Sequence, residues 1–505
     1  MSFKLDQRSC ILILSFITFI VFFPSLHNQF TNWDDQVLLT QNPIVWQLNF
    51  ENLRKIFDLQ FISYYPPLTL FSFAIEHHFV KLQPFMYHLD NLILHTLNVV
   101  LVFILINRLS KDVLISFLTA LLFAINPLRV ESVAWVAQRK DVLFTFFYLL
   151  SLICYLRKAP VSCFVFFILS CLAKIQGLTL PFALLILDYY QKQQGGWVVV
   201  LRKWPHFLVG LVFSMLLIKG QWPQFAAIHR FDIGEKIFLA CHAFILYSFK
   251  SIFPYQLCAL YPFPELHNSY AWPIYASALV TFFWLIAIIK NYAKHPVFVA
   301  GSLFFGINIM LALSSIISVG VFINDRFTYL PSIGLYWMLA SVTGKVLGSR
   351  WRSVGIALLI VYILILGFLS FNRSKIWFNG ISLWSDVISQ YPKLAFAYDN
   401  RGNSYVQENR NKEAFDDFSK AIALNDHFAS AYVNRAILFA KNAQAQEALN
   451  DFNKAIESDP NYANAYFNRG IFYLQKSDQL KAKEDFLKAK ELGMDIPKSL
   501  YFSGT

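Results

Sequence analysis

Long uninterrupted runs of apolar residues fill the chain up to about residue 372. A helix needs about 20 apolar residues to cross a bilayer, and backbone polar groups in lipid have to be satisfied within the segment. The pattern therefore predicts an all-α fold, with a polytopic membrane domain of about eleven or twelve spans over residues 1–372. Several runs are too short for a full span and indicate re-entrant or broken helices. The runs lie near 9–25, 86–107, 112–126, 142–156, 160–173, 177–190, 196–219, 236–254, 272–290, 296–320, 327–347 and 353–371.

Charged residues around the runs predict the orientation of the chain. Lys4 and Arg8 precede the first run, and no small-residue cleavage site follows it, which indicates an uncleaved first span with a cytoplasmic N-terminus. The aromatic stretch 61–80 contains Glu76, which favours an interfacial helix over a span. The last span then exits outward, so the residues after it are predicted to lie on the outer, periplasmic side of a bacterial inner membrane.

After Arg373 polar residues take over, and a repeat with a period of 34 residues begins. Tyr398, Tyr432 and Tyr466 each start a Tyr-x-Asn-Arg tetrad. A helical hairpin of this period, with small residues at the helix contacts, is typical of the tetratricopeptide repeat. We expect a connecting helix or half repeat at 373–394 and an α-solenoid of three repeats at 395–505. The tetrads supply the candidate partner-binding residues Asn400, Arg401, Asn434, Arg435, Asn468 and Arg469.

Composition agrees with a membrane protein, since 56% of the 505 residues are hydrophobic and only 15% are charged. The net charge of +12 is spread over loops between apolar runs, where positive charge holds loops in the cytoplasm, and forms no nucleic-acid-binding stripe. The six cysteines include no Cys-x-x-Cys pair and mostly lie in or beside apolar runs. They indicate neither a disulfide framework nor a zinc site.

Two adjacent carboxylates, Asp34 and Asp35, stand where the chain leaves the first apolar run. An acid in this place can take a proton from an acceptor hydroxyl. It can also hold a divalent cation, such as Mg²⁺ or Mn²⁺. The alternative is a solvated turn, because Asn32 and Asp34 are turn-forming residues. Both interpretations stay open on these residues alone.

A dense group of charges joins two apolar runs between Arg129 and Asp141. Apolar residues at helical spacing predict that this block is a short amphipathic helix at the interface. Charges at membrane depth indicate a functional site. Arg129, Arg139 and Lys140 suit a phosphate group, and Glu131 and Asp141 can orient them. The alternative is mutual ion pairing that only holds the loop in place.

Two further cations lie at the edges of apolar runs, and of these Lys174 stands alone. A lipid phosphate is one candidate counter-ion for Lys174, and snorkelling of its ammonium group to a headgroup is the alternative. Arg326 opens the penultimate run, where Asp325 suggests a local ion pair and Tyr329 suggests an interfacial aromatic.

One apolar run carries a polar face. His88, Asn91, His95 and Asn98 recur at helical spacing within 86–107. As zinc ligands the two histidines are two turns apart, with no obvious third ligand. Hydrogen bonding between helices is the better interpretation.

These residues, in this order, resemble the transmembrane and tetratricopeptide-repeat O-mannosyltransferases, whose membrane half belongs to the C-type glycosyltransferase superfamily. The blocks that start at Asn126 and Asp325 look closest to a bacterial branch of that family. The motifs that carry the resemblance are Trp33-Asp34-Asp35 with Asn42-Pro43, Tyr65-Pro66-Pro67-Leu68-Thr69, Tyr87-His88-Leu89, Asn126-Pro127 through Glu131, Arg139 with Asp141-Val142-Leu143, and Arg326 through Gly334.

The resemblance implies a membrane enzyme that moves a sugar from a polyprenyl-phosphate donor to a hydroxyl acceptor, a protein Ser or Thr, at the outer face. It implies Asp34 or Asp35 as the general base and Glu131 as the group that orients acceptor or donor. The repeats would present the protein acceptor. The donor phosphate would be held by Arg139, Lys174 and Arg326, with Arg129 as a further candidate and with His88, Asp141 and Tyr329 in support.

Two other classes of protein are alternatives to the enzyme, a membrane scaffold and a transporter. A non-enzymatic membrane scaffold for envelope protein assembly would use the repeats and need only an anchor, although an anchor has no need of charged outer loops. A transporter would show an inverted repeat or paired broken helices, which the sequence does not display.

Overall fold

The computed structural model describes residues 6–58, 66–192, 196–226, 231–264, 271–311, 313, 321–497 and 500, with only the backbone given for 217–226. Lys4, Tyr65 of the family motif, residues 61–65 of the predicted interfacial helix and most of 312–320 in the predicted run 296–320 lie outside the described residues. The chain forms two compact units, Met1–Phe378 and Asn379–Thr505. Every regular element in the described residues is a helix, which confirms the predicted all-α fold.

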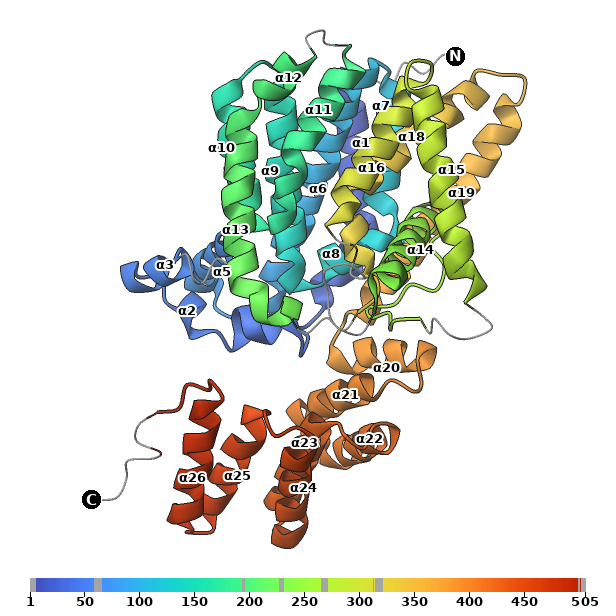
Figure 1. Ribbon diagram of the computed structural model, residues 1–505. Coiled ribbons are helices and arrows are strands. Elements are labelled where there is room, and N and C mark those ends of the chain that lie inside the picture. The colour runs from blue at the N-terminus through green and yellow to red at the C-terminus, as the bar shows by residue number, and fades with distance from the viewer. Residues whose placement is uncertain are drawn as a thin grey trace. The chain divides into compact units, whose positions relative to one another are not determined.

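Apolar helices packed side by side make up the first unit (Figure 1). Several begin at a proline or at an acidic N-cap. Asp112, for example, accepts hydrogen bonds from the backbone N–H groups of Leu114 and Ile115 at 2.9 and 3.1 Å, which satisfies amides that the helix itself leaves unpaired. The longer helices are α1 (Gln7–Phe22), α5 (Pro67–Val80), α6 (Pro84–Ser110), α7 (Val113–Ile125), α9 (Arg139–Leu156), α10 (Pro160–Ala173), α11 (Leu180–Tyr190), α13 (Trp204–Ala226), α14 (Ile233–Ile252), α15 (Trp272–Asn291), α16 (Pro296–Met310), α18 (Ser332–Leu347) and α19 (Arg352–Ile376).

Short helical turns connect these helices and build the loops that matter for the site. The turns are η1 (Phe23–His27), η2 (Gln36–Thr40), α2 (Pro43–Trp46), α3 (Phe50–Ile56), η3 (Pro127–Arg129), α8 (Val130–Ala134), η4 (Val136–Gln138), η5 (Ile175–Thr179), α12 (Trp197–Leu201) and η6 (Asp325–Thr328). Of these, α2 and α3 lie beside the bundle, with α5 next to them (Figure 1).

The protein is a multi-pass membrane protein. In the described part of the chain, four helices are long and apolar enough to cross a membrane alone, namely α1 with η1, α6, α15 and α19. The pair α7 and η3–α8 adds a fifth if it is one bent span, and shorter apolar helices accompany them. The predicted eleven or twelve spans, and the predicted orientation, stay predictions.

The charged block after α7 differs from its prediction. Asn126 and Pro127 end α7, and the chain turns by 57° into η3 and α8. A second break at Trp135, whose backbone is extended, separates α8 from η4, and α9 starts at Arg139. All residues from Pro127 to Arg139 are buried. The prediction of one amphipathic helix at the interface was therefore wrong, because the block is a broken segment packed inside protein.

Two glycines let α16 and α18 cross closely. A Cβ atom added at Gly301 would lie 2.6 Å from the carbonyl oxygen of Gly334, so neither position has room for a side chain. Small residues at such crossings allow the close backbone approach on which helix association in lipid depends.

The second unit is a stack of helical hairpins. Phe418 and its equivalents Phe452 and Phe486 are buried between the two helices of each hairpin. A Cβ atom at Gly402 would lie 2.5 Å from Cε1 of Phe418, which explains the small residue at this position of the tetrads. The hairpins are α21 (Ala395–Gln407) with α22 (Asn411–Leu424), α23 (Ala429–Lys441) with α24 (Ala445–Ser458), and α25 (Ala463–Gln475) with α26 (Gln479–Glu491), preceded by α20 (Gly380–Gln390).

Candidate functional site

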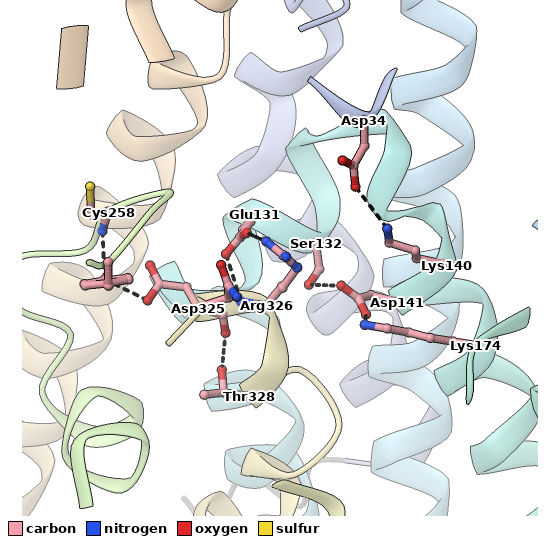
Figure 2. A network of polar contacts seen from close by, with 12 residues as sticks. Asp34, Glu131, Ser132, Lys140, Asp141, Lys174, Cys258, Asp325, Arg326 and Thr328 are labelled. Atoms are coloured by element: carbon pink, nitrogen blue, oxygen red, sulfur yellow. Dashed lines mark hydrogen bonds and ion pairs between the residues drawn. The ribbon is translucent and has the colours of Figure 1, made fainter. Parts of the chain in front are cut away.

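Three acid–base pairs gather where the first loop (residues 28–35, between η1 and η2), the broken segment and η6 meet (Figure 2). Each pair joins segments that are far apart in the sequence. The pairs are Asp34 with Lys140, Glu131 with Arg326, and Asp141 with Lys174. We call these six residues the ion-pair cluster. It brings together four of the seven residues to which the resemblance assigns a catalytic or phosphate-binding role.

Asp34 is the most accessible acid of the ion-pair cluster. Its side chain is 37% exposed, against 4% for Glu131 and 1% for Asp141. The Lys140 ammonium group lies 3.2 Å from the Asp34 carboxylate. Burial acts against ionisation of Asp34, but the charges of Lys140, Arg326 and Lys174 outweigh it and lower the pKa of this carboxyl below its usual range. Asp34 is therefore an ionised, reachable carboxylate beside three cations.

Asp35 faces the other way and holds the first loop. It is buried, and its Oδ2 accepts hydrogen bonds from the backbone N–H and the hydroxyl of Thr31 at 2.8 and 2.9 Å. Its Oδ1 accepts from the backbone N–H of Ala137 in η4 at 2.7 Å. Burial raises the pKa of Asp35 to about 6, although these hydrogen bonds act in the opposite direction. This carboxyl ties the loop to the broken segment.

Stacked tryptophans fix the same loop from its other side. Trp33 stacks on Trp135 with ring centroids 4.7 Å apart, and Trp135 stacks on Trp377 at 5.1 Å. The three rings come from the first loop, the broken segment and the residue after α19. Asp34, next to Trp33, is thus positioned by rigid packing on one side and by Asp35 on the other.

Glu131 and Arg326 make two contacts with each other. Besides the ion pair of their side chains, the backbone N–H of Arg326 donates to Oε2 of Glu131 at 2.9 Å. The Arg326 guanidinium also lies over the Trp135 ring, 5.4 Å from its centroid. The predicted local pair of Asp325 with Arg326 was wrong, because Asp325 instead accepts a hydrogen bond at 2.9 Å from the hydroxyl of Tyr261.

Asp141 and Lys174 form the most enclosed pair of the ion-pair cluster. The hydroxyl of Ser132 donates to the second oxygen of Asp141 at 3.3 Å. The Lys174 ammonium lies over the rings of Phe144 and Phe327. Lys174 thus faces protein groups, and the alternative that its side chain snorkels to a headgroup was wrong.

Arg129 donates its hydrogen bonds to protein oxygen atoms. Its guanidinium is fully buried and donates to the carbonyl oxygens of Thr328 and Tyr329 at 3.0 and 2.6 Å and to the Thr328 hydroxyl at 2.6 Å. These bonds hold η6 against η3. The geometry therefore supports a positioning role for Arg129.

Arg139 is also committed to protein groups. It pairs with Glu76 of α5, donates from Nε to the side chain of Asn91 at 3.0 Å, and donates from Nη2 to the carbonyl oxygen of Tyr87 at 3.0 Å. Sequence reasoning did not assign Glu76 to the site. A carboxylate inside an aromatic run was the signal that could have found it.

The polar face of α6 joins helices, as predicted. His95 is within hydrogen-bonding distance of the Tyr329 hydroxyl at 2.7 Å and of the Ala124 carbonyl at 3.1 Å. Asn98 donates to the carbonyl of Val142 at 2.8 Å and to the Tyr329 hydroxyl at 3.2 Å. His88 is buried on the same face. Across the residues that the structure describes, no three His, Cys, Asp or Glu side chains gather as a metal-binding group.

The tetrad arginines of the repeats bind acids within their own hairpins. Arg401 donates through Nε and Nη2 to the two oxygens of Asp417 at 2.7 and 2.8 Å, and the other two hairpins repeat this contact. Each bond links the two helices of one hairpin. The tetrad asparagines do not share one contact, since Asn434 bonds to Asp399 while Asn468 bonds to its own helix. The arginines therefore link the two helices of each hairpin, and partner binding by the tetrad residues stays a prediction.

Together these features define a class of protein: a multi-pass membrane protein with ion pairs buried in its helical unit and with tetratricopeptide repeats after it. The family model described as TPR repeat matches residues 444–477, and the model described as Tetratricopeptide repeat matches 397–428 and 463–492. The predicted repeats are thus confirmed.

Curated relatives extend over the membrane unit as well. Protein O-mannosyl-transferase F38B6.6 of Caenorhabditis elegans is 27% identical over 444 residues, covering 82% of this chain and 62% of that protein. Protein O-mannosyl-transferase TMTC1 of Homo sapiens is 24% identical over 433 residues, covering 71% of this chain and 48% of that protein. The chain thus spans about half to three fifths of the length of these relatives. It is similar to these protein O-mannosyl-transferases, which confirms the resemblance, and the bacterial branch stays a prediction.

Proposed function

We propose that this protein is a membrane glycosyltransferase that transfers a sugar from a polyprenyl-phosphate donor to a hydroxyl group of a protein at the outer face of the membrane. The observation that carries the proposal is Asp34, a reachable and ionised carboxylate held beside Lys140, Arg326 and Lys174. The relatives, whose names describe protein O-mannosyl-transferases, support the same reaction class.

Asp34 is the base in this proposal. The bond between the anomeric carbon of the sugar and the donor phosphate oxygen breaks, a bond from the acceptor oxygen forms, and the acceptor proton moves to Asp34. A carboxyl with a lowered pKa is a weak base, but it suffices when the sugar is oxocarbenium-like in the transition state, because the hydroxyl becomes acidic as its new bond forms. Asp35 keeps the loop in place and does not take part in the chemistry.

The cations of the ion-pair cluster stabilise the leaving group. The lipid phosphate gains one negative charge as it departs, and fixed cations in a site of low dielectric favour that charge. Lys140 and Arg326 are the better candidates, since their side chains are 19% and 15% exposed, while Lys174 is 10% exposed and paired with a buried acid. Glu131 orients Arg326. A divalent cation such as Mg²⁺ or Mn²⁺ is a further candidate component.

The repeats present the acceptor protein in this proposal. Trp377, which stacks on Trp135, lies two residues before the start of the repeat unit. The chain thus links the repeats covalently to the unit that carries Asp34. A tether raises the local concentration of a bound acceptor without any new contact.

Purified protein reconstituted in vesicles tests the proposal. A panel of polyprenyl-phosphate sugars is supplied with candidate acceptor proteins, with and without divalent cation, and release of the free lipid phosphate is measured. Asp34→Asn should reduce turnover by about a hundredfold to ten-thousandfold, which is the usual contribution of a general base. Glu51→Gln, an exposed acid of the same unit, is the matched control and should keep full activity.

Folding of the Asp34 variant is checked by thermal unfolding. The Asp34–Lys140 pair is partly exposed, so its loss should change stability by no more than about 1 kcal/mol. A folded variant with unchanged turnover would exclude Asp34 as the base. No turnover by folded wild-type protein with any donor would refute the enzyme and favour a membrane-anchored scaffold.

A further inference from the structure

A second polar site lies at the start of α9, and its lining includes none of the six residues of the ion-pair cluster. A cavity of about 460 Å³ opens between α5, α6 and the start of α9. Its lining is mostly apolar but includes Glu76, Asp90 and Arg139. Small-molecule sites have this composition, with an apolar wall and a few convergent polar groups. Neither the sugar-transfer proposal nor the relatives assign a ligand to this cavity.

The cavity has an unbalanced negative charge. Glu76 and Asp90 face one guanidinium, and Arg139 already donates to Glu76, Asn91 and Tyr87. The second oxygen of Glu76, a residue only 7% exposed, has no hydrogen-bond partner among the described residues. Asp90 is half-buried in α6, and within the same part of the chain it forms neither a hydrogen bond nor an ion pair. The two carboxylates therefore favour a cationic group between them.

The entrance to the cavity is apolar. Phe79 is 76% exposed, Ile93 44% and Ile75 38%, and all three line the cavity. Exposed apolar patches mark sites of contact with membranes or with other proteins, and in a membrane protein such a patch suits lipid chains. A ligand that enters here therefore has a hydrocarbon part outside and a cationic part inside.

We propose that this cavity binds the primary ammonium headgroup of a membrane lipid, such as phosphatidylethanolamine, with the ammonium between Glu76 and Asp90 and the lipid chains along Ile75, Phe79 and Ile93. A primary ammonium has three N–H donors. The cavity offers three carboxylate oxygens that lack donors, one from Glu76 and two from Asp90. A choline headgroup carries the same charge but has no N–H to donate, so it satisfies none of them.

The test compares lipids that differ only in the headgroup. The full-length protein in detergent is titrated with phosphatidylethanolamine, with phosphatidylcholine of the same chains and with N-acylated phosphatidylethanolamine, which has lost the ammonium charge. Binding is followed by native mass spectrometry and by the shift of the unfolding temperature. Phosphatidylethanolamine should bind at least about tenfold more tightly than either of the others, as expected for charge-assisted hydrogen bonds.

Variants separate this site from general lipid binding. Asp90→Asn should bring the preference for phosphatidylethanolamine to within about twofold of phosphatidylcholine, while Glu51→Gln should leave it unchanged. Ser72→Phe, which fills the cavity without changing its charge, should weaken all three lipids. Equal binding of the lipids by wild-type protein, or an unchanged preference in Asp90→Asn, would overturn the proposal. Stabilisation by Na⁺ or Mg²⁺ alone that disappears in Asp90→Asn would also overturn it, since the site would then hold an inorganic cation.

Discussion

Breaking the Glu131–Arg326 pair should separate the structural and the chemical roles of the ion-pair cluster. Arg326→Met leaves the carboxylate of Glu131, 4% exposed, with one hydrogen bond from the backbone and no cation. Glu131→Gln leaves the guanidinium of Arg326 without its acid. The double variant removes both charges, so neither a carboxylate nor a guanidinium is left without its counter-charge.

The expected energies follow from burial. Removing one partner of a buried pair costs about 3–5 kcal/mol, because the other charge stays without compensation. Water reaches the 15% exposed side chain of Arg326 and reduces this loss of stability. Each single variant should therefore lose about 3 kcal/mol, at the lower end of the range. A buried pair replaced as a whole by uncharged groups is often neutral in stability. The double variant should therefore unfold within about 1 kcal/mol of wild type.

The measurement pairs thermal unfolding with turnover for the wild type, both single variants and the double variant. Stability should fall in each single variant and return in the double variant. Turnover should stay at least about a hundredfold below wild type in all three, because the cation that favours the leaving phosphate is missing or displaced. A stable double variant with wild-type turnover would show that the pair only holds the fold. A double variant as unstable as the single variants would refute the reasoning on burial.

Three further predictions concern stability. The folded state raises the pKa of Asp35 from 3.8 to about 6, so its contribution is fully present below pH 4 and is lost as pH rises through 6. Wild type should lose about 3 kcal/mol relative to Asp35→Asn over this range, measured by unfolding at each pH. Gly402→Ala should destabilise the repeats by about 1–2 kcal/mol, because its Cβ meets Phe418. The next repeat has Ala436 at the equivalent position, so that hairpin already accommodates the methyl group. Differential scanning calorimetry measures the change, and a variant that unfolds at a higher temperature than wild type would contradict the prediction. Gly334→Ala should force α16 and α18 apart at a cost of about 1–3 kcal/mol, visible as a lower unfolding temperature in detergent.

The repeats could be predicted in detail because their signal is local. Each Tyr-x-Asn-Arg tetrad and each buried Phe recurs at one spacing, and helical hairpins stack with their neighbours in sequence. The bond of Arg401 to Asp417, 16 residues later, lay within reach of the same reasoning. It was missed because tetrad residues on one helix face were taken as partner contacts.

The contacts within the ion-pair cluster could not be predicted from the sequence. The charged residues were found, but not their partners, since Glu131 and Arg326 are 195 positions apart and the sequence holds no record of which segments meet. Nor does a charge reveal whether it faces water or packed protein, so Arg129 and Arg139 could not be told from Arg326. The break at Trp135 also escaped prediction, because apolar spacing on both sides continues as if the helix did.

The tryptophan stack is an intrinsic spectroscopic probe of how three distant segments pack together. Trp33, Trp135 and Trp377 touch only when the first loop, the broken segment and the end of the last long helix are all in place. Closely stacked indoles couple their electronic transitions and add an exciton signal to the circular dichroism spectrum that separated indoles lack. That signal reports the order of the loop around Asp34 without any label, and each variant above can be scored by it before a substrate is known.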